Sequence, residues 1–358
     1  MEKVRCAVIG AGWWATTAHI PALKSHPAAE LVAVQTSEQE TADRIAADFD
    51  APYATTVVED VLALDELDAV IVSSIPKLHY EQAKAALERG MHVLIEKPMT
   101  FTVREARELV EIAERNHLVF LISAPWHYTP HGIEARRLIQ AGALGQLKMI
   151  SILMTNFTQG LYQGLPWEKV FGKNPTLQNS ATPYLRPGQY SYSDPLLAGG
   201  GQIYCQVSHA AAYVGFLTNT QPREVFARFD NAGTAVDVYD ALNIKLSDGT
   251  LVSLASTGAT MLSDRHYEVR IYGTRGMILL ELWKGTMEFH DIDCNVQRYS
   301  DLPEAEIYPM FAPAGNFVDA VLGQAPNGSP ATLGLYAMKI IEAARASAGE
   351  NRNVVIAD

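Results

Sequence analysis

One lysine stands where its side chain could move a proton. Lys97 follows an apolar run at residues 92–95 and precedes Pro98. Proline disfavours helical geometry in the residue before it, so the lysine is held in one direction. A lysine amine that is desolvated or close to a positive charge can lose its proton near neutral pH and then take one from a hydroxyl group. By position alone, a lysine at the end of a strand is more often a solvated surface residue.

A short glycine-rich segment could bind a dinucleotide. It reads Gly10-Ala11-Gly12-Trp13-Trp14-Ala15, follows an apolar run and opens a helical pattern, as the GxGxxG/A fingerprint requires. Gly10 permits the tight turn, and Gly12 lets main-chain amides approach a pyrophosphate at the helix N-terminus. At Ala15 a small residue suffices for close contact between helix and strand. The segment predicts an NAD(P) site, with a purely structural glycine turn as the alternative.

The end of the second apolar run bears on the choice between NAD and NADP. An acidic residue there binds the adenosine ribose in NAD enzymes, whereas a nearby basic residue accommodates the 2′-phosphate of NADP. This sequence has Thr36 and Ser37 at that place, followed by Glu38 and with no adjacent arginine. Glu38 favours NAD as the cofactor, and NADP stays open.

The elements that must position these residues alternate through the first third of the chain. Short apolar runs separated by helical patterns cover residues 4–9, 31–34, 69–73, 92–95 and 118–122. This alternation is typical of buried parallel strands in βαβ units. We therefore predict a doubly wound Rossmann domain over residues 1–124. In such a domain Lys97 lies at the carboxyl edge of the sheet, where ligands of open α/β folds bind.

After Pro125 the pattern changes to hairpins. Asp248-Gly249 separates two apolar segments, and residues 273–276 separate two more, as tight turns between antiparallel strands do. We predict a C-terminal α/β domain over residues 125–358, with a large, mostly antiparallel open sheet. Residues 157–198 have weak periodicity and are expected to form an irregular excursion over the cleft between the domains. A closing helix at residues 333–348 is expected to pack back towards the first domain.

Composition limits the partners and the location. The chain has 358 residues, enough for two domains, and a net charge of −12. An acidic balance argues against nucleic acid or an anionic membrane as partner. The spacing of Cys6, Cys205 and Cys294 is not typical of a disulfide framework or a zinc site. Because the sequence shows no signal-peptide pattern and no long apolar run, we expect a cytoplasmic protein without a metal site.

An ordered series of segments resembles the Gfo/Idh/MocA family, the glucose-fructose oxidoreductase and inositol dehydrogenase group. The series covers nearly the whole chain. It comprises the turn at 10–15 with His19 and Pro21, residues 68–79, ALERGMHVLIEKPMT at 86–100, HYTPHGIEARRLIQAGALGQL at 127–147, AGGGQIYCQVSH at 198–209 and YGTRG at 272–276. The resemblance implies a Rossmann domain, a second domain on a large open sheet, homodimers or homotetramers packed through that sheet, and hydride transfer to or from carbohydrate carbons.

The resemblance also assigns roles to residues. Lys97 matches the family's catalytic lysine, and His209 matches a histidine that approaches the reacting hydroxyl from the second domain. Glu96 matches a residue near the nicotinamide ribose. The implied cofactor site consists of Glu96, Lys97, the loop residues Ser74, Ile75 and His79, and the fingerprint residues Gly10, Gly12, Trp13, Trp14, Ala15, Thr36 and Ser37.

The sequence departs from the family pattern in front of His209. Family members usually have an aspartate four residues earlier, on the same helix face, where this chain has Cys205. A thiol neither grips a sugar hydroxyl as a carboxylate does nor stabilises a charged imidazole. Gln202 and Gln206 lie one helical turn apart and could orient substrate hydroxyls. The alternative for Gln206 is packing against the second domain.

Further candidates are expected around the cleft. His127-Tyr128 replaces the more usual arginine-aromatic pair and is expected to line the cleft and contact substrate, with a structural tyrosine as the alternative. Lys169, Lys173 and Arg186 in the excursion could supply a basic pocket for an anionic sugar, although exposed surface is the other fate for each.

These residues are compatible with three functions. The leading hypothesis is reversible oxidation of a secondary alcohol on a pyranose or cyclitol, in which Lys97 assisted by His209 removes the hydroxyl proton. A second is an NAD-dependent glycoside hydrolase that transiently oxidises the sugar, eliminates the aglycone, adds water and reduces the sugar again. This hypothesis is compatible with cysteine at position 205 and with the tyrosines of the excursion, Tyr184, Tyr190 and Tyr192. A third is a non-catalytic NAD(P)-binding sensor, against which the presence of Lys97 and His209 argues.

Overall fold

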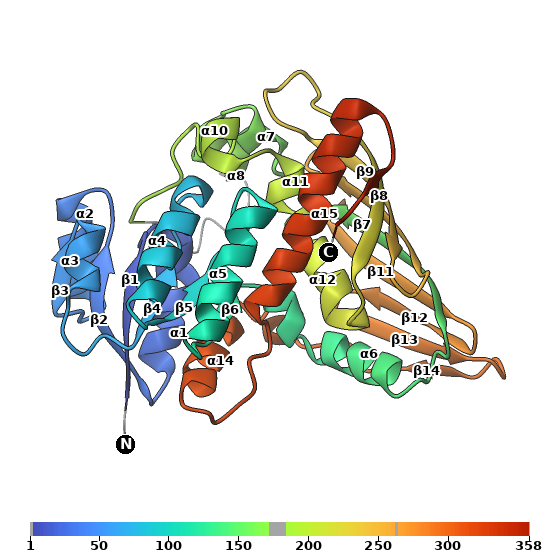
Figure 1. The fold of residues 1–358 in the computed structure, drawn as a ribbon, viewed down its shortest axis with the longest axis horizontal. Coiled ribbons are helices and arrows are strands. Elements are labelled where there is room, and N and C mark those ends of the chain that lie inside the picture. The colour runs from blue at the N-terminus through green and yellow to red at the C-terminus, as the bar shows by residue number, and fades with distance from the viewer. Residues whose placement is uncertain (1–2, 172–183, 262–263, 358) are drawn as a thin grey trace.

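Two β-sheets organise the chain, with helices packed around and between them (Figure 1). The computed structural model describes residues 3–171, 184–261 and 264–357. The first sheet has six strands in the order β3-β2-β1-β4-β5-β6, and the second has nine in the order β14-β13-β12-β11-β7-β10-β9-β8-β15. This architecture confirms the predicted fold class, a Rossmann sheet followed by a large open sheet.

All strand pairs of the first sheet are parallel. Its strands are apolar and buried because helices cover both faces of the sheet. The strands are β1 (Val4–Ile9), β2 (Ala29–Gln35), β3 (Tyr53–Thr55), β4 (Ala69–Val72), β5 (His92–Ile95) and β6 (Phe120–Ile122). The helices between them are η1 (Ala15–His19), α1 (Ile20–Ser25), α2 (Gln39–Asp48), α3 (Val58–Leu62), α4 (Pro76–Glu88) and α5 (Val103–Arg115).

The strand order of this sheet reverses between β1 and β4. From β1 the chain proceeds outward to β2 and β3, and it then returns to place β4 on the other side of β1. The loops that follow β1 and β4 therefore diverge at one point of the carboxyl edge, which is where open α/β sheets bind ligands. The glycine-rich turn follows β1 at this point.

The second sheet is mixed rather than wholly antiparallel. Its strands are β7 (Leu147–Thr155), β8 (Pro222–Asp230), β9 (Tyr239–Leu246), β10 (Leu251–Thr257), β11 (His266–Gly273), β12 (Gly276–Glu281), β13 (Thr286–Asp291), β14 (Val296–Arg298) and β15 (Val354–Val355). Both predicted hairpins are present, β9 with β10 and β11 with β12. The pair β7–β10 is parallel, because the long connection between these strands provides the crossover that parallel neighbours need.

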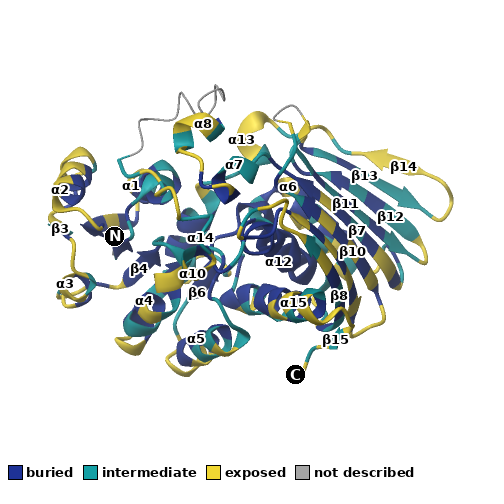
Figure 2. Ribbon diagram, turned by 90° about the horizontal axis from the view of Figure 1, so that it is seen from above, coloured by how far each residue is buried: buried dark blue, intermediate teal, exposed yellow. Residues whose placement is uncertain are grey.

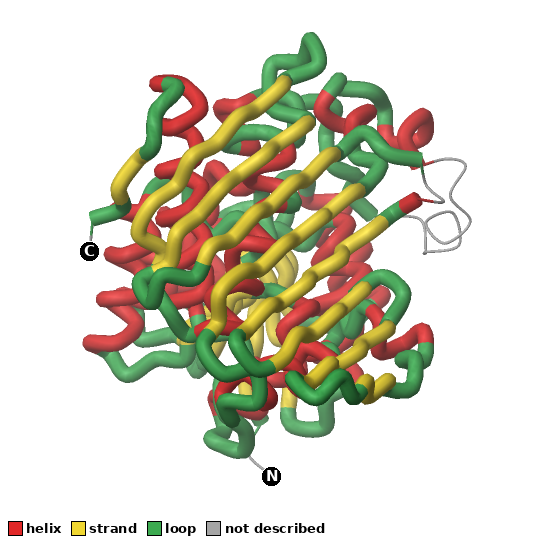
Figure 3. Tube along the Cα trace, turned by 90° about the vertical axis from the view of Figure 1, so that its right-hand side faces the viewer, coloured by secondary structure: helices red, strands yellow, loops and turns green. Residues whose placement is uncertain are grey.

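Helices cover one face of the second sheet and leave the other open. Residues of β9 and β10 alternate between buried and exposed, as a strand with one packed face requires. Figure 3 shows the strands in front with the helices behind them, and Figure 2 shows buried and exposed positions alternating along the strands. The helices of this half are η2 (Pro125–Tyr128), α6 (Pro130–Gln140), α7 (Gln159–Tyr162), α8 (Trp167–Phe171), α10 (Pro195–Ala198), α11 (Gln202–Cys205), α12 (Val207–Thr218), α13 (Glu304–Ile307), α14 (Ala312–Val321) and α15 (Ala331–Glu350).

The last two helices join the two halves. Helix α15 packs against α5 and β6 on one side and against α12 and β8 on the other (Figure 1). Helix α14 packs on α1 and β6, and its Phe317 is buried in the same hydrophobic cluster as the residues of β1. The division at residue 124 thus stays a prediction, since the C-terminal helices contribute to both cores. Among the described residues, no helix combines the length and apolar character needed to cross a membrane.

Candidate active site

The glycine-rich turn fits a dinucleotide. Gly10 has a φ of 78°, and a Cβ there would lie 2.4 Å from the Ser74 main chain, so only glycine is tolerated. A Cβ on Gly12 would meet nothing closer than 3.7 Å, which leaves the main chain approachable. At the end of β2 the Thr36 Oγ1 atom is buried and has no hydrogen-bond partner among the described residues. An open main chain and an unused hydroxyl are what a pyrophosphate and a ribose need.

Glu96, at the end of β5, is held as a buried carboxylate. Its Oε1 atom accepts hydrogen bonds from Trp14 Nε1 at 2.8 Å and lies 2.9 Å from His19 Nε2. Burial alone would raise the pKa of Glu96, but hydrogen bonds from His19 and Ser123 and the charge of Lys97 lower it to about 2. Trp14 therefore positions Glu96, and the carboxylate places a fixed negative charge beside Lys97.

Lys97 and His209 border the same small cavity. The Lys97–Pro98 peptide is cis, and the Lys97 Nζ atom donates a 3.0 Å hydrogen bond to the Cys205 carbonyl oxygen. The cavity measures about 10 Å³, enough for about one water molecule, and Ser123 and Ser208 also line it. The first domain and helix α12 thus each contribute one of these residues to the wall of the same cavity.

His209, in the first turn of α12, is a buried and neutral imidazole. Its Nδ1 atom has no hydrogen-bond partner among the residues that the structure describes. Burial lowers the pKa of His209 well below its usual value, and the charge of Lys97 lowers it further. A neutral imidazole with a free ring nitrogen can accept a proton or a hydrogen bond.

Around Cys205, thiol and amide groups form a buried network. The Cys205 side chain is buried, and Gln206 Nε2 lies 3.6 Å from its Sγ atom. Gln202 accepts a 2.8 Å hydrogen bond from the Tyr162 hydroxyl and donates one of 2.8 Å to Ser256. Gln202 is also fully buried, and both the oxygen and the nitrogen of its amide bind protein groups, which favours a structural role. Gln206 is half-buried at the start of α12.

His127 and Tyr128 lie beneath the site rather than on its cavity. The His127 ring is buried, stacks on Phe216 at 4.6 Å and lies 2.8 Å from Ser329 Oγ. Burial and the charge of Arg136 lower the pKa of His127 to about 3. The Tyr128 hydroxyl donates a 3.0 Å hydrogen bond to Asn316 in α14. These contacts favour the structural alternative, and the expectation that the pair lines the cleft stays a prediction.

Hydrogen bonds of His79 hold the loop after β4 in place. The ring of this buried histidine lies 2.9 Å from the Ser74 carbonyl oxygen and 2.8 Å from that of Pro98. The Ser74 hydroxyl donates to Gln82, while Ile75 precedes α4 as its N-cap. His79 thus fixes the position of the loop, whereas Ser37 at the end of β2 is exposed.

Two family models match this chain. The one described as the oxidoreductase family with NAD-binding Rossmann fold matches residues 4–123, and the GFO/IDH/MocA C-terminal domain matches residues 133–279. Together they cover more than half of the sequence. The chain belongs to the Gfo/Idh/MocA oxidoreductase family. This confirms the resemblance and the expected cofactor class, since the first domain is an NAD-binding Rossmann domain.

Similar proteins include enzymes named for sugar substrates. The chain is 33% identical over 148 residues to a D-xylose 1-dehydrogenase (NADP(+)) of Haloarcula marismortui, a match that covers 40% of this chain and 41% of that protein. It is 34% identical over 154 residues to a dTDP-3,4-didehydro-2,6-dideoxy-alpha-D-glucose 3-reductase of Streptomyces antibioticus, covering 43% of this chain and 46% of that protein. The matched segments thus span less than half the length of these curated relatives.

Solved structures share the whole fold. An oxidoreductase domain protein from Kribbella flavida superposes with a TM-score of 0.83 at 18% identity, over the full length of both chains. A levoglucosan dehydrogenase in complex with NADH and levoglucosan superposes with a TM-score of 0.81 at 17% identity, again over both full chains. At such identities the likeness establishes the fold alone.

An aromatic cluster joins this Gfo/Idh/MocA site, and sequence reasoning missed most of it. The ring centroid of Tyr308 lies 6.2 Å from that of Trp14, 4.8 Å from that of Trp126 and 5.4 Å from that of Trp283. Trp14 also binds Glu96, so the cluster extends from the first domain into the second. Its members come from separate segments without a shared motif, and no sequence signal connects them.

The excursion lies on the glycine-rich turn. The Trp13 amide donates a 2.9 Å hydrogen bond to the Leu185 carbonyl oxygen, and the Trp13 ring packs on Trp167 at 4.8 Å. The Tyr184 hydroxyl donates to Asp48 of α2 at 2.7 Å. Within its described part the excursion contains the short helices α7, α8 and α10, so it is less irregular than predicted.

Two of the residues considered for a basic pocket in the excursion, Lys169 and Arg186, are described by the structure. Arg186 pairs with Glu168, and Lys169 is exposed. Lys173 lies outside the described residues. Of the tyrosines considered for a hydrolase, Tyr190 is exposed, and Tyr192 packs on the cluster of buried residues that contains Cys205.

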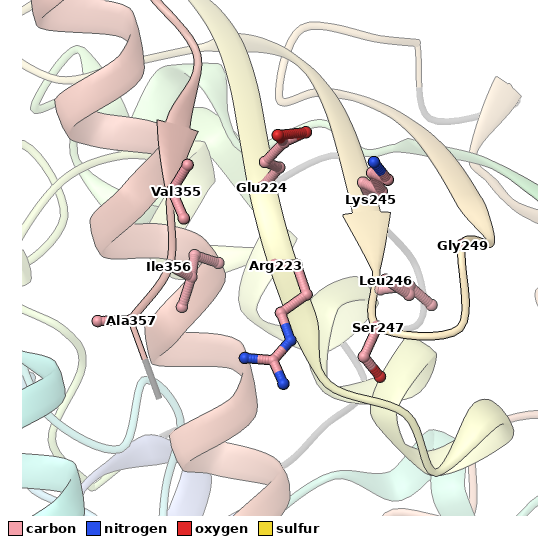
Figure 4. A pocket seen from close by; sticks show the side chains of 9 residues that line it. All are labelled: Arg223, Glu224, Lys245, Leu246, Ser247, Gly249, Val355, Ile356 and Ala357. Carbon is pink, nitrogen blue, oxygen red and sulfur yellow. The ribbon is translucent and has the colours of Figure 1, made fainter.

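A wider groove lies at the β15 edge of the second sheet. It runs between β8, the turn from β9 to β10, and residues 355–357 (Figure 4). Its charged side chains, Arg223, Glu224 and Lys245, project from neighbouring strands, and none of its lining residues belongs to the site described above.

Proposed function

We propose that the protein is an NAD(P)-dependent oxidoreductase that transfers hydride between nicotinamide and a secondary alcohol carbon of a sugar, glycoside or cyclitol. The observation that carries the proposal is the shared cavity of Lys97 and His209, which come from different domains. Family membership supports it, as do the names of the relatives, which include a xylose dehydrogenase and a sugar 3-reductase.

The residues that would hold the cofactor are the turn at Gly10 and Gly12, Thr36 at the end of β2, and the loop at Ser74. When bound there, NAD or NADP supplies the hydride acceptor or donor. The conformation of Gly10 and the unused Thr36 hydroxyl support this assignment. NAD is the preferred cofactor in this proposal, because no arginine adjoins Thr36 for a 2′-phosphate.

Lys97 is the residue that exchanges a proton with the substrate hydroxyl. Its amine is fixed by the Cys205 carbonyl, which leaves its other hydrogens for a substrate oxygen. His209 is neutral, so it offers a hydrogen-bond acceptor or proton acceptor beside the ammonium instead of repelling it. The Glu96 carboxylate balances the charge of Lys97 and is itself kept in place by Trp14 and His19.

The test is turnover by the purified protein. We expect NADH or NADPH to accumulate, measured by absorbance, with at least one member of a panel of aldoses, glycosides and cyclitols. Lys97→Met should lower kcat about 100- to 10,000-fold, the usual contribution of a positioned acid or base. Lys84→Met, which removes a surface lysine paired with Glu108, is the matched control and should retain activity. Absence of turnover with every compound would contradict the proposal, and aglycone release without net NADH would indicate the hydrolase instead.

We also propose that the protein forms a homodimer or homotetramer through the open face of the second sheet. Met149 and Leu153 of β7 are exposed, and they pair with Leu251 and Ala255 of β10 on the same face. A row of exposed apolar side chains across adjacent strands is typical of a protein interface. Light scattering checks the mass, and Leu153→Lys should shift it towards the monomer.

A further inference from the structure

Arg265 lies just before β11 with its charge half-buried. Its guanidinium carbon is 3.2 Å from the ring centroid of Trp283 and 6.0 Å from that of Phe157. Burial lowers the pKa of this arginine, which shows that the surroundings disfavour its charge. An arginine side chain that stacks on an indole is held in one plane with its N–H groups pointing outward from the ring edge.

This arginine belongs to the aromatic cluster of the active site. Trp283 and Tyr308 stack at 5.4 Å, and Tyr308 in turn contacts Trp14, which binds Glu96. The Tyr308 hydroxyl lies close to both Glu96 and Arg265. Burial raises the pKa of Tyr308, the charge of Glu96 raises it further, and the charge of Arg265 lowers it. Arg265 therefore stands on the second-domain side of the same site as Lys97.

The nearby carboxylates do not neutralise Arg265. Asp264 and Glu281 both bind the ring of His266, at 2.8 and 3.1 Å. Glu281 also accepts hydrogen bonds from the main-chain amides of Tyr267 and Trp283. Among the described residues, the Arg265 guanidinium has no ion-pair or hydrogen-bond partner, and the Trp283 Nε1 atom is buried without one. Two donors thus remain unused on one side of the site.

We propose that Arg265 binds an anionic substituent of the substrate, so that the sugar oxidised or reduced here carries a carboxylate or a phosphate group. The proposal rests on the proposed oxidoreductase function and names its substrate class. The planar guanidinium matches the two oxygens of a carboxylate or phosphate, and a partly desolvated position strengthens such a hydrogen bond. The stacked Trp283 fixes the orientation of the arginine before the ligand arrives, which reduces the entropy lost on binding.

The test compares ligands that differ in charge. D-glucose, D-glucuronate and glucose 6-phosphate are titrated calorimetrically into the full-length protein with saturating NAD, and the same compounds are assayed for turnover. We expect one of the two anions to bind more tightly than glucose, and Arg265→Met to weaken that anion roughly 10- to 100-fold while leaving glucose unchanged. Methionine keeps an apolar side chain against Trp283 and removes the charge together with the N–H donors. Arg265→Lys should give an intermediate affinity, because it keeps the charge without the planar fork.

The control is Arg298→Met, which removes an exposed arginine of β14 that pairs with Glu288. It should leave the affinities for all three compounds unchanged. The proposal would be overturned if Arg265→Met and the original protein bound both anions with equal affinity. Oxidation of neutral sugars in that case would still support the proposed function. Loss of anion binding in Arg265→Met without turnover of any sugar would support the anion site and contradict the oxidoreductase function. The compound whose affinity falls in Arg265→Met, glucuronate or glucose 6-phosphate, identifies the anionic group as a carboxylate or a phosphate.

Discussion

The Nζ atom of Lys97 donates a 3.0 Å hydrogen bond to the main-chain carbonyl oxygen of Cys205. This contact joins the end of β5 in the first sheet to the end of α11 in the second domain, next to the first turn of α12 that carries His209. The position of the amine therefore depends on the docking of both domains. The hydrogen bond uses the main chain of Cys205, so it does not depend on which side chain stands at this position.

Lys97→Arg separates charge from proton transfer. Arginine keeps the positive charge, but its pKa is too high for it to give up a proton at neutral pH. If Lys97 moves a proton, we expect Lys97→Arg to lose kcat about as strongly as Lys97→Met, roughly 100- to 10,000-fold. The measurement is steady-state turnover with the preferred sugar, accompanied by the Kd for NAD, which should change little. A Lys97→Arg protein with nearly full kcat would show that only the charge matters.

The ionisation of His209 should respond to Lys97. Burial lowers the pKa of His209, and the charge of Lys97 lowers it further. Lys97→Met removes the second cause, so the pKa of His209 should rise while staying below its usual value because the burial persists. An NMR titration of the imidazole C–H signals checks this, with His209→Gln used to assign the resonance. An unchanged pKa in Lys97→Met would mean that the two side chains do not interact.

Local sequence patterns were enough to predict the elements that carry the site. The apolar runs 4–9 and 92–95 correspond to β1 and β5 residue for residue, and Asp248-Gly249 forms the expected turn, with a φ of 88° at Gly249. These features depend on residues that are neighbours in the chain. Strands β13 and β14 were not predicted, because their half-buried or exposed positions lack a clear apolar alternation.

Contacts between segments that are far apart in the chain could not be predicted from the sequence. Tyr308, Trp126 and Trp283 come from three segments that are far apart in the chain, and nothing in their spacing indicates that their rings meet. The burial of His127 against Phe216 has the same origin. The family resemblance predicts a substrate role for His127, which stays untested, whereas the packing of its ring could not be read from the sequence. Whether Lys97 and His209 have the roles proposed for them awaits the variants above.

Asp240→Asn should stabilise the protein at neutral pH. Burial raises the pKa of the Asp240 carboxyl well above its model-compound value of 3.8, and the charge of Asp237 raises it further. A folded-state pKa that is raised for an acid means that the folded protein retains a proton that the unfolded chain releases, so stability falls as pH rises above 3.8. Asparagine has no proton to retain. We expect the free energy of unfolding to rise by roughly 1 to 3 kcal/mol at pH 8 and to change little at pH 4, measured by urea denaturation.

Asp237→Asn is the matched comparison and should act in the opposite direction. The Asp237 carboxylate accepts hydrogen bonds from the main-chain amides of Gly201 at 2.9 Å and Ile203 at 2.6 Å, and so holds the start of α11. Asparagine retains one acceptor oxygen, so the loss should be roughly 1 to 2 kcal/mol at pH 8. If Asp240→Asn destabilises the protein at pH 8 as Asp237→Asn does, the buried Asp240 is not protonated in the folded state.

Tyr184→Phe should increase the affinity for NAD. The Leu185 carbonyl oxygen accepts the Trp13 amide hydrogen, in the turn whose amides are expected to bind pyrophosphate. The contact is held in place by the Tyr184 hydroxyl, which donates to Asp48 at 2.7 Å, and by Arg44, which donates to the Tyr184 carbonyl oxygen at 3.1 Å. Removing one of these hydrogen bonds weakens the competing contact, so the Kd for NAD measured by calorimetry should fall roughly two- to tenfold. Tyr190→Phe alters an exposed tyrosine of the same segment and should leave the Kd unchanged. A higher Kd in Tyr184→Phe would mean that the segment helps to hold the cofactor rather than competing with it.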